Sequence, residues 1–109
     1  MKNKAVKVKP VNAGFFVFWN GEKPSDAILY KDVIEIMLIR YGFITEDLVG
    51  LRFILKGNAY VSYEVYEDTE GFWDLWKRLK DVFGIEIEKY EALIAKNKIF
   101  DPVTICVIH

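Results

Sequence analysis

The sequence predicts an α+β fold in which a four-stranded antiparallel sheet carries its helices on one face. Strand-like alternation and helix-like spacing follow one another along the chain as strand, helix, strand, strand, helix, strand. The chain has 109 residues, of which 52% are hydrophobic, and this suits one hydrophobic core. We therefore expect a single α+β domain over residues 13–109, preceded by a basic arm or edge strand over residues 1–12.

The N-terminal part of the chain predicts an arm followed by a buried strand. Residues 5–9 alternate apolar and basic side chains and stop at Pro10, as in a frayed arm or an edge strand whose lysines discourage pairing with another chain. Residues 15–19 are five consecutive aromatic or β-branched residues, closed by Asn20 and Gly21. Such a run before a turn is typical of a buried, central strand.

The next element is predicted to be a helix over residues 26–41. Ser25 or Asp26 can cap its first free N–H groups, and Gly42 ends it. Its apolar positions extend well beyond one face. This helix therefore has to be covered on more than one side, by the last helix of the chain or by a second subunit.

A tight hairpin is predicted next. Two strands, over residues 51–55 and 59–66, are joined by Lys56-Gly57-Asn58, which supplies the positive φ that a tight turn needs. A second helix begins near residues 68–70 and ends at Gly84.

The C-terminal part predicts one more helix and one more strand. Residues 87–97 carry inward apolar positions at helical spacing. Residues 103–108 form a closing strand after Pro102, which is tolerated at a strand start.

This order is that of the ferredoxin-like plan, βαββαβ, in which the first and third strands form the central pair. Right-handed crossovers place all helices on one face of the sheet and leave the other face open. Alternation assigns side chains to the two faces, and in the ambiguous first strand we expect Phe16 and Phe18 on the open face. The other residues expected there are Arg52, Ile54, Lys56, Tyr60, Ser62, Glu64, Tyr66, Thr104, Cys106 and Ile108, with Val103, Ile105 and Val107 turned to the core.

Residues 56–63, Lys-Gly-Asn-Ala-Tyr-Val-Ser-Tyr, resemble the first ribonucleoprotein motif of the RNA recognition motif (RRM) family, K/R-G-F/Y-G/A-F-V-x-F/Y. Asn58 departs from this motif at a position where the family usually carries a stacking aromatic. The resemblance implies that Tyr60, with Phe16 or Phe18, stacks on bases and that Lys56 contacts phosphate.

Composition and charge argue against several classes of protein. The formal net charge of −1 does not point to a strongly basic nucleic-acid protein. Because Cys106 and His109 are the only residues of their types, a miniprotein held by disulfides or zinc is excluded. No apolar run approaches the roughly 20 residues of a membrane span, and no signal peptide is recognised. We therefore expect no membrane partner and a cytoplasmic location. The lack of Gln and the scarcity of Ser resemble hyperthermophile usage.

No catalytic constellation, cofactor site or metal site is predicted. A glycine-rich phosphate loop, a serine nucleophile elbow and paired metal ligands are all missing from the sequence. One group of carboxylates is interpreted as solvated charge at a helix N-terminus, with a Mg²⁺ or Ca²⁺ site as the alternative. Its opposite charge to the lysines of residues 2–9 suggests a contact between subunits. The group comprises Glu64, Glu67, Asp68, Glu70 and Asp74.

Two functional interpretations follow. In the first, the chain is a small non-enzymatic interaction module, a homodimer that binds a protein partner as a regulator or inhibitor, through the apolar sheet face or the first helix. In the alternative, the aromatic sheet face binds single-stranded RNA or DNA. Trp73 is added as a partly exposed interface residue, because Trp76 takes the inward position on its helix. The candidate binding residues are Phe16, Phe18, Arg52, Ile54, Lys56, Tyr60, Tyr66 and Trp73.

Overall fold

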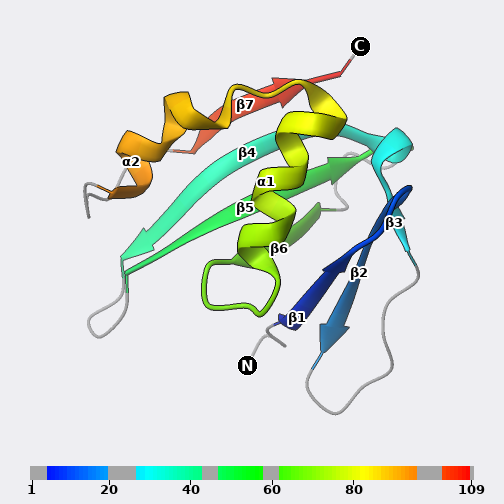
Figure 1. The fold of residues 1–109 in the computed structure, drawn as a ribbon, viewed down its shortest axis with the longest axis horizontal. Coiled ribbons are helices and arrows are strands. Elements are labelled where there is room, and N and C mark those ends of the chain that lie inside the picture. Colours follow the sequence, from blue (N-terminus) through cyan, green and yellow to red (C-terminus); the bar gives the residue numbers. More distant parts are fainter. Residues whose placement is uncertain (1–4, 20–26, 43–46, 58–61, 96–101, 109) are drawn as a thin grey trace.

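The structure is a computed structural model that describes residues 5–19, 27–42, 47–57, 62–95 and 102–108. The described residues form two antiparallel sheets and a helical layer (Figure 1). The small sheet has the strand order β1-β2-β3, and the large sheet has the order β6-β5-β4-β7. The strands are β1 (Ala5–Pro10), β2 (Gly14–Trp19), β3 (Ile28–Leu29), β4 (Val33–Gly42), β5 (Asp47–Leu55), β6 (Ser62–Tyr66) and β7 (Val103–Val107). The helices are α1 (Phe72–Phe83) and α2 (Glu91–Ala95), with 3₁₀ turns η1 (Tyr30–Asp32) and η2 (Ile87–Tyr90).

The predicted α+β class with a four-stranded antiparallel sheet is confirmed, but the helix predicted over residues 26–41 is wrong. Residues 33–42 form β4, which pairs with β5 on one side and with β7 on the other. Four of its ten residues are β-branched, which suits a strand inside a sheet. Apolar side chains lie on both faces of β4. Ile36 and Leu38 face the core, and on the other face Ile39 is buried and Met37 is half-buried. The described elements therefore do not follow the βαββαβ order.

Most other elements lie where the sequence predicts them. β5 and β6 form the expected antiparallel pair, and Gly57 in the following turn has φ +90°. α1 ends at Gly84, which caps it in the left-handed conformation with φ +69°. η2 and α2 together replace the helix predicted over residues 87–97 as far as residue 95. No helix within the described ranges is long and apolar enough to cross a membrane.

The small sheet departs from the predicted topology. β2 is a central strand, as expected, but its neighbours are β1 and β3 rather than the hairpin strand β6. Residues 5–10 thus form an edge strand and not a frayed arm. The cause is the strand character of residues 33–42, which fill the place beside β5 and leave β2 in a separate sheet.

The core lies where α1 and the small sheet pack against one face of the large sheet. Phe15 of β2 and Phe53 of β5 join the two sheets, with ring centroids 4.9 Å apart. Figure 1 shows α1 crossing this face of the large sheet. Leu93 and Ile94 of α2 pack against the same core, so both helices cover one face. α1 contributes Phe72, Leu75, Trp76 and Leu79, which recur at three- and four-residue steps.

The segment before α1 is docked on the edge of β1. The Val8 N–H donates to the Glu70 carbonyl over 2.7 Å, and the buried Thr69 hydroxyl donates to the Ala5 carbonyl over 3.1 Å. The Lys7 ammonium and the Glu70 carboxylate lie 3.8 Å apart. The sequence suggested a contact between the lysines of residues 2–9 and carboxylates of different subunits. For Lys7 and Glu70 the contact lies within one chain.

Candidate functional site

The face of the large sheet that points away from the core is the candidate functional site. Directly opposed residues of an antiparallel pair share a face. The register pairs Met37 with Arg52, Arg52 with Glu64, and Gly50 with Tyr66. The residues of this open face are Glu35, Met37, Ile39, Leu48, Gly50, Arg52, Ile54, Ser62, Glu64, Tyr66, Thr104 and Val107.

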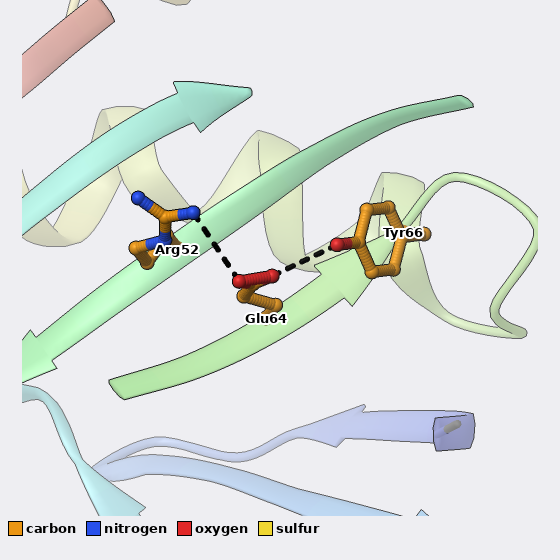
Figure 2. A network of polar contacts seen from close by, with 3 residues as sticks. All are labelled: Arg52, Glu64 and Tyr66. Carbon is orange, nitrogen blue, oxygen red and sulfur yellow. Dashed lines mark hydrogen bonds and ion pairs between the residues drawn. The ribbon is translucent and has the colours of Figure 1, made fainter. Parts of the chain in front are cut away.

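A polar network of three residues occupies the open face on β5 and β6 (Figure 2). The Arg52 guanidinium contacts Glu64 Oε1 at 3.3 Å, and the Tyr66 hydroxyl donates to Glu64 Oε2 over 2.8 Å. Both oxygens of the Glu64 carboxylate are therefore engaged. The side chains of Arg52 and Glu64 are each 26% exposed, so the ion pair is screened only in part. The positive charge of Arg52 and the negative charge of Glu64 thus balance within this network.

Apolar side chains surround this network. Ile39 is only 2% exposed although it does not belong to the hydrophobic core cluster. Its direct partner is Gly50, over which the Tyr66 ring lies. Met37 and Ile54 are half-buried beside it on the same face. The open face thus combines one buried apolar side chain, Ile39, with two half-buried ones, Met37 and Ile54.

Three of the predicted site residues, Arg52, Ile54 and Tyr66, are brought together on the open face. Lys56 is exposed just beyond the end of β5, at the rim of this face. Tyr60 lies outside the described residues, as do residues 58–61, half of the segment 56–63 on which the RRM resemblance rests.

The structure does not bring the other predicted residues to this face. Phe16 and Phe18 lie on β2 in the small sheet, because β2 does not pair with β6. Within that sheet, Phe15 and Val17 are buried whereas Phe16 and Phe18 are half-buried, so the expected inside–outside assignment of this strand is correct. Trp73 is exposed on α1, which covers the opposite face of the large sheet.

The alternation predicted for β7 is reversed at its end. A register shift lies between Ile36 and Met37 of β4 and their partners on β7. As a result Cys106 pairs with Ile36 on the core side and packs against the core, whereas Val107 is turned outward and is 53% exposed. The expected positions of Cys106 and Val107 are therefore wrong, because an irregularity in one strand inverts the alternation beyond it.

The predicted acidic group is divided among separate partners. Glu64 belongs to the network on the open face, Glu67 Oε1 accepts from the Val49 N–H over 3.2 Å, and Glu70 faces Lys7. Across the described ranges, no three His, Cys, Asp or Glu side chains are grouped so that they could hold a metal ion. Burial raises the pKa of the Cys106 thiol, which favours its neutral form.

Sequence reasoning missed Met37 and Ile39, because residues 26–41 were assigned to a helix. The available signal was the apolar character of both faces together with the high share of β-branched residues in this segment. Comparisons with models of protein families, with curated proteins and with solved structures find no match to the chain.

Proposed function

We propose that the chain acts by binding rather than by catalysis, as a homodimeric interaction module whose subunits meet through the open face of the large sheet. The observation that carries the proposal is the combination of half-buried apolar residues, Met37 and Ile54, with the neutral Arg52–Glu64 pair on one sheet face. A sheet face of this composition gains apolar burial when it packs against another protein surface. A helix in this segment is no longer a candidate interface, because residues 33–42 form β4.

The charge arrangement favours a second copy as the occupant. Arg52 and Glu64 lie side by side on neighbouring strands. In a two-fold interface the same patch meets itself, so the Arg52 cation of one subunit can approach the Glu64 carboxylate of the other. Two such faces stack about 10 Å apart when sheets pack face to face. The Arg52–Glu64 pair is therefore complementary in charge to the same pair of a second copy.

Single-stranded nucleic acid is less favoured on this face. A phosphate would have to compete with the Glu64 carboxylate for Arg52 and would meet the negative charge of Glu64 itself. The aromatic side chains that were expected to stack on bases beside it, Phe16 and Phe18, lie on the other sheet.

The oligomeric state tests the proposal. We expect sedimentation equilibrium or light scattering to give a dimer mass for the native chain, with dissociation on dilution. Ile54→Lys, directly opposite Glu35, adds a long charged side chain to the open face without a like-charge neighbour across the strands, and should yield a folded monomer. Val82→Lys makes the same kind of change on the exposed side of α1 and should remain a dimer.

Two results would contradict this proposal. One is a native chain that stays monomeric at concentrations of several hundred micromolar. The other is equal loss of the dimer in the Ile54 and Val82 variants, which would indicate a general effect of added charge. Circular dichroism of each variant checks that the fold is retained.

A further inference from the structure

The side of the small sheet that faces away from the core alternates lysine with phenylalanine. The register of β1 and β2 places Lys7 directly opposite Phe18 and Lys9 directly opposite Phe16. Opposed residues share a face, so these four side chains form one patch. The Lys7 ammonium lies 5.6 Å from the centroid of the Phe18 ring, within the range of a cation–π contact. Leu29 of β3, which pairs with Gly14, extends the same face.

This patch, called the outer face, is separate from the core. Phe15 and Val17 alternate with Phe16 and Phe18 along β2 and are fully buried. Among the described residues, neither Phe16 nor Phe18 belongs to the core cluster or to the half-buried side chains packed against it. The two rings are thus partly accessible on a β-strand, whereas Lys7 and Lys9 beside them are exposed.

We propose that the outer face binds single-stranded nucleic acid, with bases stacked on Phe16 and Phe18 and phosphates held by Lys7 and Lys9. Phenylalanine rings offer stacking surfaces to any base without selecting one by hydrogen bonds. The two lysines are about 7 Å apart along β1, given the rise of about 3.4 Å per strand residue, so both can serve one short stretch of backbone. This inference concerns a different sheet from the proposed dimer interface and does not depend on it.

The ion pair between Lys7 and Glu70 does not block such binding. The Glu70 carboxylate is 3.8 Å from the Lys7 ammonium, and the side chains of Lys7 and Glu70 are 47% and 73% exposed. Exposed pairs of this kind contribute little to stability and are screened by salt. Replacing the Glu70 carboxylate beside Lys7 by a phosphate therefore costs little free energy. The negative charge of Glu70 nevertheless lowers the affinity of the outer face for nucleic acid.

Fluorescence anisotropy with labelled twelve-nucleotide poly(dT) and poly(U) tests the proposal. Each phosphate contact with a single strand contributes a slope of about −0.7 to the dependence of log K on log salt, so two lysines predict about −1.4, or a loss of about sevenfold between 50 and 200 mM salt. Lys9→Gln, at an exposed position, should reduce this slope by about half. Phe16→Leu keeps the apolar contact, removes the ring, and should weaken binding about fivefold or more.

The control is Lys89→Gln, which removes the same charge on η2 and should leave binding unchanged. The proposal is overturned if no oligonucleotide binds at 20 mM salt, or if Lys9→Gln and Lys89→Gln weaken binding equally. It also fails if a duplex of the same length binds as tightly as the single strand, since stacking on the rings needs unpaired bases.

Binding to vesicles of anionic lipid without binding to oligonucleotides would assign the outer face to a membrane surface instead. Since Phe16 and Lys9 are remote from the open face, these variants leave the oligomeric state as an independent readout.

Discussion

The ring of Tyr66 lies directly over Gly50 on the neighbouring strand of the large sheet. A Cβ atom at position 50 would stand 2.7 Å from Cδ1 of that ring and 3.0 Å from the Val65 carbonyl oxygen. Glycine therefore allows Tyr66 to lie flat across the sheet and to place its hydroxyl 2.8 Å from Glu64 Oε2. The absence of a side chain at one position orients the polar network at another.

Gly50→Ala is expected to displace the Tyr66 ring and weaken its bond to Glu64. Overpacking of this kind costs about 1–3 kcal/mol of unfolding free energy, measured by chemical denaturation. In a Tyr66→Ala background the same substitution should cost less, with a coupling energy of about 0.5–3 kcal/mol. Additive effects of the two substitutions would show that the ring does not depend on Gly50.

Gly71→Ala is expected to detach the segment before α1 from the edge of β1. Gly71 has φ +87°, and an added Cβ would stand 2.0 Å from the Val8 carbonyl oxygen. Gly57 is the matched control, since its φ is +90° and no atom lies within 4 Å of the added Cβ. Both alanine variants carry the left-handed strain of about 1–2 kcal/mol, and only Gly71→Ala adds the clash. Equal losses of unfolding free energy would argue against this docking contact.

Arg40→Met is expected to loosen α2. The buried Arg40 guanidinium on β4 donates to the Leu93 and Ile94 carbonyls near the end of α2. Hydrogen bonds to a charged group contribute about 1.5–3 kcal/mol, so hydrogen exchange of the η2 and α2 amides should accelerate about tenfold or more. Arg52→Met removes the same charge on the open face and should leave this exchange unchanged. Unchanged exchange in Arg40→Met would mean that apolar packing alone holds α2.

Tyr30→Phe is expected to preserve or raise stability at neutral pH and to reduce its loss in alkali. Tyr30 is buried, and its hydroxyl has no hydrogen-bond partner among the described residues. Burial raises its pKa above the ordinary value of 10.0, against a smaller lowering by Arg78. The folded state therefore holds the Tyr30 proton more tightly than the unfolded state does. As a result, the contribution of Tyr30 to the unfolding free energy is intact below pH 10 and declines as the pH rises above 10.

The measurement is the unfolding free energy at pH 7 and across pH 9–11. Tyr66→Phe is the control, because it deletes a hydroxyl that donates to Glu64 and should cost about 1 kcal/mol at pH 7. A comparable loss at pH 7 in Tyr30→Phe would reveal a partner for the Tyr30 hydroxyl.

The elements that were predicted correctly are those whose signals are local. Helix α1 follows from its apolar spacing and from Gly84, which takes the left-handed conformation that ends a helix. The β5–β6 hairpin follows from its alternation and from Gly57, and that alternation placed Arg52, Ile54 and Tyr66 on the open face. In each case the deciding interactions lie within a few residues along the chain.

Only the tertiary structure decided which strands are neighbours. A segment as apolar as residues 33–42 satisfies a helical pattern as well as an extended one, and pairing with β5 and β7 makes it a strand. That choice moved Phe16 and Phe18 away from Arg52 and set them beside Lys7 and Lys9. A register shift of one residue exchanged Cys106 and Val107 between the faces. These outcomes depend on hydrogen bonds between segments distant in the chain, and the periodicity of one segment does not encode its partner.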